Sequence, residues 1–277
     1  MSLLDKVRYD RVTAAVKAMR EDILNMSLRC GTMGAHLGGS MSAVEIMAVL
    51  YLEFMNNSTE NSNKDTRDRF IMSKAHSSMV LYAALHQIGM LTDEEIANAM
   101  INNDILFKHP KMNVPKGIEF SGGSLGQGLS LGVGTALALK LKGLAEPKVY
   151  VMLGDGECDE GSVYEAAVSA AHYQLDNLVV IVDCNKLQND GTTHQIMDKN
   201  NIAERWKVFG YSVIEVDGHD IEQLYDAFSK KVKGPVAIIA NTVKGKGVSF
   251  AENIIDWHAG YLTKELYDKA MLELRSE

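Results

Sequence analysis

The sequence predicts an α/β protein with a mostly parallel sheet and helices on both faces. Short apolar segments alternate with segments whose apolar residues recur every three or four positions, as in amphipathic helices. Polar or Gly-rich turns separate the two kinds of segment, and no two-residue hairpin turn joins neighbouring apolar segments. This alternation favours parallel pairing, because parallel strands need a crossover connection between them.

Five short apolar runs are the expected strands. They are Phe70–Met72, Val149–Leu153, Leu178–Val182, Val213–Val216 and Val236–Ala240. A polar or Gly-rich turn and then a helical pattern follow each run. In sheets of this kind the ligand lies at the carboxyl ends of the strands, so the residues that directly follow the runs are the first candidates for a site.

Helices in the first half of the chain are indicated by apolar periodicity and by capping residues. The segment Tyr9–Leu28 carries apolar side chains three or four residues apart. Ser42 with Glu45, and Thr92 with Glu95, have the spacing of a capping box. A helix is therefore expected to begin at each of these two pairs.

Three further helices are expected in the second half. A Gly-rich stretch from Gly122 leads into a buried helix that ends near Lys142, and another helix follows from about Asp159. The last covers Thr263–Arg275.

Length and charge restrict the class of protein. The 277 residues, of which 46% are apolar, can build one sizeable core, so a single domain over residues 1–277 is expected, with Asn56–Arg69 as its most loop-like stretch. Lys and Arg number 28 and Asp and Glu 36, which gives a net charge of −8. An acidic protein repels phosphate backbones, so no nucleic-acid partner is expected.

Cysteine usage and the first residues indicate the compartment. Cys30, Cys158 and Cys184 form no C-x-x-C pair and leave one cysteine over from any disulfide, which fits a reducing cytosol. Met1–Asp10 is rich in charge and lacks the apolar core of a signal peptide. No run approaches the eighteen apolar residues of a spanning helix, so a cytoplasmic protein without membrane contact is expected.

Two polar residues follow successive expected strands. Asp155 stands between Gly154 and Gly156 directly after one run, and Asn185 stands after the next. A lone G-D-G is an ordinary turn, but a carboxylate and an amide oxygen at adjacent strand ends could share one Mg²⁺. Magnesium completes its octahedron with phosphate and water, so a diphosphate ligand is implied.

The segment from Gly154 to Asn185 resembles the thiamine-diphosphate fingerprint. The sequence around it is similar to the transketolase family in particular. The resemblance runs in order from about Tyr9 to Gly260. It implies a thiamine-diphosphate-binding fold, with this chain as the diphosphate-binding domain and with thiamine diphosphate and Mg²⁺ as cofactors. Further matching segments are His36–Ser40, Ser73–Tyr82, His109–Pro110, Gly123–Gly128, Asp217–Asp220, Thr242–Val248 and Trp257–His258.

The resemblance assigns site residues in three groups. The metal ligands would be Asp155, Asn185 and the backbone carbonyl of Leu187. The catalytic residues on the substrate side would be His36, His109 and His258, and histidine suits this role because its unperturbed pKa lies near neutrality. The cofactor-binding residues would be His76, Gly123, Leu125, Gly154, Asp155, Gly156, Asn185 and His258.

Four more positions matter for the resemblance. Glu160 and Glu165 match acidic positions that, in the family, lie at the contact with a pyrimidine-binding domain. Ala75 stands where the family usually has Gly, and Ser124 where many members have Pro. These two departures leave the geometry of their loops open.

The remaining histidines are expected to be structural, although His219, within Asp217–Asp220, could bridge loops. The loop Lys244–Gly247 fits a basic anion-binding loop and a solvated flexible turn equally well. The glycines from Gly122 to Gly134 lack the full G-x-G-x-x-G of a dinucleotide site. The other three histidines in the structural group are His86, His172 and His194.

As a whole, the resemblance implies the N-terminal subunit of a two-chain transketolase. Such an enzyme transfers a two-carbon ketol unit from a ketose phosphate to an aldose phosphate, as in the pentose phosphate pathway of carbohydrate metabolism. The partner would be a C-terminal subunit whose pyrimidine-binding domain supplies the activating glutamate, with two copies of each chain in a heterotetramer. The alternatives are a subunit of another thiamine-diphosphate enzyme, such as a deoxyxylulose phosphate synthase or a dehydrogenase component, and a catalytically silent scaffold subunit.

Overall fold

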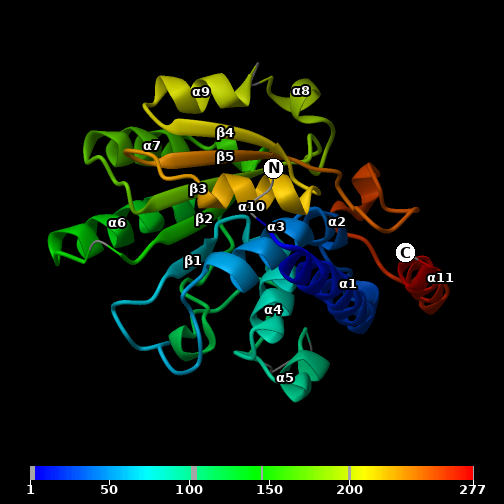
Figure 1. The fold of residues 1–277 in the computed structure, drawn as a ribbon. Helices are drawn as coiled ribbons and strands as arrows, with labels where there is room; N and C mark the ends of the chain where they lie inside the picture. Colours follow the sequence, from blue (N-terminus) through cyan, green and yellow to red (C-terminus); the bar gives the residue numbers. More distant parts are fainter. Residues whose placement is uncertain (1–3, 101–104, 145, 199–200, 277) are drawn as a thin grey trace.

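Five parallel strands form the centre of the computed structural model, which describes residues 4–100, 105–144, 146–198 and 201–276. The sheet has the order β1-β2-β3-β5-β4, and each neighbouring pair is parallel (Figure 1). Every expected strand lies within one of these, so the predicted fold class is confirmed. The strands are β1 (Arg69–Met72), β2 (Val149–Gly154), β3 (Leu178–Cys184), β4 (Ser212–Asp217) and β5 (Val236–Asn241).

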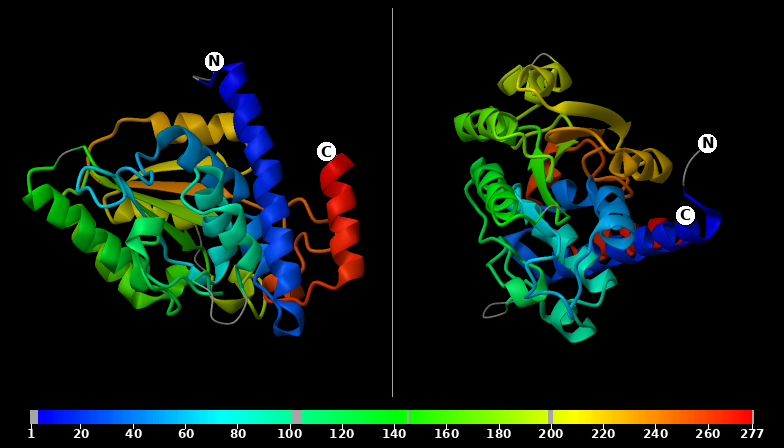
Figure 2. Two further views of the ribbon diagram at one scale, coloured as in Figure 1. Left: turned by 90° about the horizontal axis from the view of Figure 1, so that it is seen from below. Right: turned by 60° about the vertical axis from the view of Figure 1, so that its left-hand side comes forward.

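Helices cover both faces of the sheet. The α-helices are α1 (Lys6–Arg29), α2 (Leu37–Met41), α3 (Val44–Val49), α4 (Ser78–Gln87), α5 (Asp93–Asn98), α6 (Gln127–Leu141), α7 (Gly161–His172), α8 (Thr193–Ile196), α9 (Ile202–Val208), α10 (Ile221–Ser229) and α11 (Lys264–Ser276). Shorter helical turns are η1 (Gly31–Met33), η2 (Leu50–Phe54), η3 (Ala75–Ser77), η4 (Val114–Lys116), η5 (Glu157–Asp159) and η6 (Ile255–His258). Helices α6, α7 and α9 lie on one side, and α3 and α10 on the other with α1 and α4 packed outside them (Figure 2).

Alternate side chains of one strand enter two separate cores. Tyr150 and Met152 of β2 belong to the core under α3 and α10, whereas Val151 and Leu153 belong to the core under α6 and α7. A strand that is covered on both faces must be apolar at every position, because successive side chains point to opposite faces. This explains why the sequence shows continuous apolar runs here.

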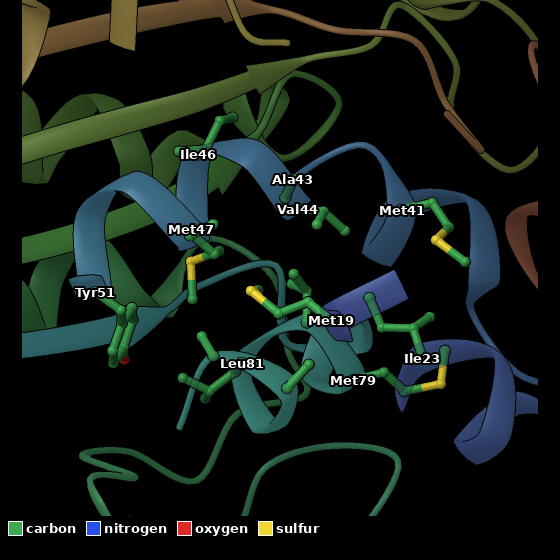
Figure 3. Close-up of a cluster of buried hydrophobic side chains, with 14 of the residues drawn as sticks. Met19, Ile23, Met41, Ala43, Val44, Ile46, Met47, Tyr51, Met79 and Leu81 are labelled. Carbon is green, nitrogen blue, oxygen red and sulfur yellow. The ribbon is translucent and has the colours of Figure 1, made fainter. Parts of the chain in front are cut away.

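Methionines fill much of the larger core. Met19 of α1, Met41 of α2, Met47 of α3 and Met79 of α4 meet in one buried cluster (Figure 3). Their unbranched, adaptable side chains suit the irregular space between helices that cross at different angles. The cluster packs α2 and α4 against the same core, and the segments directly before these two helices carry two of the predicted site histidines.

Of the two predicted capping boxes, one is confirmed and one is wrong. Thr92 accepts a hydrogen bond from the Glu95 backbone N–H, and the Glu95 side chain bonds back to Thr92. Ser42 instead ends α2, and its hydroxyl donates to Asp183 Oδ2 at 2.6 Å, while Glu45 forms an ion pair with Arg20. Buried tertiary partners outcompete the local cap at this position.

The other helix predictions are confirmed. The helix expected over Tyr9–Leu28 is α1, and those expected in the second half are α6, α7 and α11. Residues 56–68 lie outside every helix and strand, as predicted for Asn56–Arg69, whereas Arg69 itself begins β1. Within the described part of the chain, none of the helices has the length and apolar character needed to cross a bilayer.

His86 is held between two carboxylates from different helices. Its Nδ1 lies 2.8 Å from Asp22 of α1 and its Nε2 lies 2.9 Å from Asp93 of α5. Burial by itself would lower the pKa of His86, but hydrogen bonds and charge from both carboxylates raise it above its ordinary value. A raised pKa means that the folded state binds the proton more tightly than the unfolded state, so protonation stabilises the fold.

We therefore predict that His86→Gln destabilises the protein more at pH 5.5 than at pH 9. The stabilisation by His86 is fully present below the unfolded pKa of about 6.5 and is lost as the pH rises through the higher folded value. Because the site is partly exposed, the loss at low pH should be on the order of 1 kcal/mol. Urea unfolding at both pH values would measure it, with the exposed His172→Gln as control; equal losses at both pH values would contradict the prediction.

Candidate cofactor and substrate site

Asp155 and Asn185 lie side by side at the carboxyl end of the sheet. Strands β2 and β3 are neighbours, with Gly154 opposite Asp183, so the residues that follow them are brought together. The backbone N–H of Lys186 donates to Asp155 Oδ2 at 2.6 Å and joins the two turns directly. The structure therefore juxtaposes these two residues as the sequence predicted.

Three kinds of oxygen gather at this point. Asp155 contributes a buried carboxylate, whose Oδ1 also accepts the N–H of Gly156 at 2.7 Å. Asn185 contributes an amide oxygen that accepts the N–H of Leu187 at 3.2 Å, and Leu187 contributes its carbonyl. Among the described residues no cluster of three or more His, Cys, Asp or Glu side chains could hold a metal, so any ion here would rely on one carboxylate and neutral oxygens. That donor set suits Mg²⁺ when phosphate oxygens complete it.

Lys244 places a buried ammonium beside the same oxygens. Its Nζ donates to the carbonyls of Leu187 at 3.0 Å and Gln188 at 3.2 Å, and lies 2.9 Å from Nδ1 of His258. Burial lowers the pKa of Lys244 to about 8, while the charge of Asp155 opposes that shift. The Lys244 ammonium thus lies at the Leu187 carbonyl that was predicted to bind metal, and it adds a positive charge to this end of the pocket.

Lys244 was missing from the predicted site residues. The sequence signal was the loop Lys244–Gly247, which composition leaves equally open to a flexible turn. The structure shows an ordered loop: Gly245 has a φ of 78°, and a Cβ there would lie 2.4 Å from the carbonyl oxygen of Ala251. Only glycine fits this close approach.

A second buried lysine, Lys74, neutralises Asp183 beneath the pocket. Lys74 Nζ pairs with the Asp183 carboxylate and donates to the Gly39 carbonyl at 2.7 Å. Ser42, Thr242 and Asn185 also donate to this carboxylate. Burial alone would raise the pKa of Asp183, but the charge and hydrogen bond of Lys74 hold it below its ordinary value.

The bond from Asn185 has a consequence for the metal site. Because the Asn185 amide nitrogen donates to Asp183 at 3.2 Å, its oxygen is turned the other way. Asp183 thus orients the amide oxygen that was predicted to bind metal, a positioning role that outer residues commonly have at metal sites.

Four predicted histidines form one cluster. The ring of His36 lies 5.3 Å from that of His76, 5.8 Å from that of His109 and 5.5 Å from that of His258, and the rings of His76 and His258 are 5.1 Å apart. Burial, assisted by neighbouring His and Lys charges, lowers the pKa of both His36 and His258 to about 4 and that of His76 well below its ordinary value. The imidazoles of His36, His76 and His258 are therefore neutral near pH 7.

A pocket of about 320 Å³ opens at this end of the sheet. Most of the predicted cofactor and metal residues line it, whereas His36 and His109 adjoin it through the histidine cluster. Gly123 lies outside the lining and is exposed, with open space where a Cβ would be. The predicted residues that line the pocket are His76, Leu125, Gly154, Asp155, Gly156, Asn185, Leu187 and His258.

Glu157 connects the two glycine loops that border the pocket. Its carboxylate accepts the N–H of Gly126 at 2.8 Å and that of Gly154 at 3.1 Å, and Ser73 donates to it as well. Burial raises the pKa of Glu157. The sequence analysis did not single out this residue, because an acidic residue beyond a G-D-G turn gives no sign that it turns back toward a distant loop.

The departure at Ala75 is accommodated by a neighbouring glycine. Ala75 is fully buried in η3, and a Cβ at Gly122 would lie 2.4 Å from the Ala75 Cβ. The methyl group of Ala75 thus occupies space that Gly122 leaves empty. Ser124, the second departure, is exposed, so its side chain needs no space left by a neighbouring residue.

His219 bridges two loops. Val243 donates its N–H to Nε2 of His219 at 2.8 Å, so Nδ1 carries the proton and donates to Glu45 at 3.1 Å. This chain of contacts fixes the backbone next to Lys244. Glu160 lines the rim of the pocket, and Glu165 lies on α7; both are exposed.

Together, the parallel sheet, the oxygen set at adjacent strand ends and the clustered histidines define an α/β protein whose pocket is suited to an anionic cofactor. The sequence model of the family described as "Transketolase, thiamine diphosphate binding domain" matches residues 12–271, and the chain belongs to this family. Family membership confirms the recognised resemblance and the prediction of thiamine diphosphate as cofactor.

Relatives of two lengths match the chain. It is 41% identical to an apulose-4-phosphate transketolase subunit of Phocaeicola vulgatus, over 86% of this chain and 85% of that one. It is 38% identical to the 6-deoxy-6-sulfo-D-fructose transketolase subunit SqwG of Clostridium sp., over 89% and 91%. Human transketolase is 38% identical over 87% of this chain but only 39% of its own length.

Solved structures agree with the fold. The transketolase of Leishmania mexicana superposes with a TM-score of 0.86 at 28% identity and covers 95% of this chain. That of Campylobacter jejuni gives 0.85 at 27% identity with the same coverage. The chain spans 41% and 43% of these two proteins.

We predict that Lys74→Met destabilises the protein by about 3–5 kcal/mol, because it leaves the Asp183 carboxylate buried without a counter-charge. Adding Asp183→Asn should recover part of the loss, since no buried charge then remains. Urea unfolding measures both. The control is Lys142→Met, which breaks an exposed pair with Asp65 and should cost less than about 1 kcal/mol. A Lys74 variant no less stable than this control would contradict the prediction.

Proposed function

We propose that this protein is the N-terminal, cofactor-binding subunit of a two-chain transketolase, with residues 1–277 as one diphosphate-binding domain. The observation that carries the proposal is one pocket in which Asp155 and Asn185 lie at adjacent strand ends beside a cluster of neutral histidines. The names of two relatives of similar length, both called subunits of a transketolase, support the two-chain form.

The residues present fit thiamine diphosphate with Mg²⁺. Asp155, Asn185 and the Leu187 carbonyl would hold the metal, since all three offer oxygen donors at one place. Lys244 and His76 would face the diphosphate from the pocket wall. When bound, the cofactor supplies the carbon nucleophile and the electron sink that break the C2–C3 bond of a ketose.

The histidines of this chain would move the substrate protons. A neutral imidazole of His36 or His258 can take the proton from the C3 hydroxyl of the donor as the C2–C3 bond breaks. The same group can return a proton to the carbonyl oxygen of the acceptor aldose after the two-carbon unit is transferred. His109, exposed at the edge of the cluster, would bind a substrate hydroxyl.

A companion chain would complete the site. It would carry the pyrimidine-binding domain and the activating glutamate, and the exposed carboxylates of Glu160 and Glu165 would face it. Two copies of each chain in a cytoplasmic heterotetramer would place the sites at shared interfaces. The donors and acceptors would be sugar phosphates, as in the pentose phosphate pathway, although the relatives' names point to apulose 4-phosphate and sulfofructose for those proteins.

We predict that Asp155→Ala abolishes Mg²⁺-dependent binding of thiamine diphosphate. Asp155 is the only charged ligand proposed for the metal, and without the metal the diphosphate loses its main bridge to the protein. Calorimetry on the assembled complex would measure this, with Asp176→Ala at the opposite end of β3 as control. Near wild-type affinity in the Asp155 variant would refute the metal assignment.

The function itself is tested by co-expressing the chain with its companion. We expect the purified complex to transfer ketol units from xylulose 5-phosphate to ribose 5-phosphate or to another pair in a panel of ketose and aldose phosphates, and the chain alone to be inactive. A complex that instead joins pyruvate to glyceraldehyde 3-phosphate would indicate a deoxyxylulose phosphate synthase. Full activity of the chain alone, with no partner detected by mass spectrometry, would refute the two-chain proposal.

A further inference from the structure

Two turns at the carboxyl edge of the sheet are in direct contact. Strands β4 and β5 are neighbours, so the turn after β4, which holds His219, lies against the turn after β5, which leads to Lys244. The N–H of Gly218 donates to the carbonyl of Asn241 at 2.8 Å. A Cβ at Gly218 would lie 2.4 Å from Cγ2 of Thr242, so only glycine permits this approach.

The contact between the turns requires one tautomer of His219. The N–H of Val243, the residue before Lys244, donates to Nε2 of His219 at 2.8 Å. An imidazole nitrogen that accepts a hydrogen bond carries no proton, so the proton of the neutral ring is on Nδ1. Nδ1 lies 3.1 Å from the carboxylate of Glu45, which can accept it. In the other tautomer, Nε2–H would oppose the N–H of Val243.

Glu45 selects this tautomer because it is a buried carboxylate that is held ionised. Glu45 of α3 and Arg20 of α1 form a buried ion pair. Burial alone would raise the pKa of Glu45, but the hydrogen bond from His219 and the charge of Arg20 hold it below its ordinary value. An ionised carboxylate only accepts hydrogen bonds, so the ring nitrogen that faces it must be the donor. Arg20 also supports the far end of the loop, where a Cβ at Gly247 would lie 2.7 Å from Arg20 Nε.

The loop that is anchored in this way carries the buried ammonium of Lys244 into the pocket. The Lys244 side chain lines the pocket and donates to two backbone carbonyls there, whereas His219 lies outside the lining. The next residue, Gly245, donates its N–H to the carbonyl of Gly38 at 3.0 Å. The backbone on both sides of Lys244 is therefore held by partners from other segments, and the place of the ammonium depends on them.

We propose that His219 is a positioning residue for cofactor binding. Held in the Nδ1–H tautomer by Glu45, it fixes the loop at Val243 and thereby places the Lys244 ammonium beside the diphosphate of thiamine diphosphate. The inference rests on the proposed function, because it takes the pocket as the place of the cofactor. Residues that orient the groups in contact with a bound metal or cofactor commonly contribute about tenfold or more to affinity.

Two substitutions separate the roles of the two ring nitrogens. In His219→Gln the amide oxygen extends about as far as Nε2 and can still accept the N–H of Val243. In His219→Asn the shorter amide can donate to Glu45 but does not reach Val243. We expect the affinity for thiamine diphosphate with Mg²⁺ to fall about tenfold or more in His219→Asn and to be largely retained in His219→Gln. Calorimetry on the complex with the companion chain would measure it, with the exposed His172→Asn on α7 as control.

Hydrogen exchange on the full chain without cofactor tests the anchoring directly. The amide of Val243 should exchange faster in His219→Asn than in the unsubstituted chain, and little faster in His219→Gln or His172→Asn, because only His219→Asn removes its acceptor. Unchanged exchange of this amide in His219→Asn overturns the proposal. So does an affinity for thiamine diphosphate that is unchanged in His219→Asn or equally reduced in both His219 variants.

The outcomes also separate this proposal from the proposed function. A complex that shows the expected order of affinities but transfers no ketol unit between any sugar phosphates would refute the transketolase activity and support the positioning role of His219. A transketolase whose affinity for thiamine diphosphate is the same with histidine or asparagine at position 219 would support the activity and overturn the positioning role. A complex that binds no thiamine diphosphate overturns both.

Discussion

The arrangement of the site depends on one buried carboxylate, that of Asp183. It is fully buried at the end of β3 and is neutralised by Lys74 from the segment after β1. Its other donors come from the turn after α2, from the end of β5 and from Asn185. A buried charge is tolerated only when paired and hydrogen-bonded, so these segments must meet here for the protein to fold. The same contacts turn the Asn185 oxygen away from Asp183.

Charge and burial then give the site its chemistry. Two buried lysines, Lys74 and Lys244, lie close to three histidines that are themselves largely removed from water. Desolvation and positive neighbours both disfavour the imidazolium form, so these three imidazoles stay neutral at physiological pH. The cations proposed to attract an anionic cofactor thus also hold these histidines in the neutral form.

The methionine core links this chemistry to the scaffold. Met41 and Met79 anchor α2 and α4, whose preceding segments hold His36 and His76. A close fit is needed there, because a Cβ at Gly39 would lie 2.9 Å from the Ser77 hydroxyl beside His76. The two histidines are therefore placed by the packing of helices, and not by their own loops.

The sequence by itself determined the parallel α/β fold, the five strands and the meeting of Asp155 with Asn185. These features follow from local patterns: apolar runs covered on both faces, and the rule that parallel strands end at one edge. Only the tertiary structure decided that the Ser42 hydroxyl bonds to Asp183, that Glu157 accepts the N–H of Gly126 and that Lys244 lies at the Leu187 carbonyl. Each of these contacts joins residues that are distant in the chain. The local sequence does not indicate which buried group will need a hydrogen-bond donor or an opposite charge.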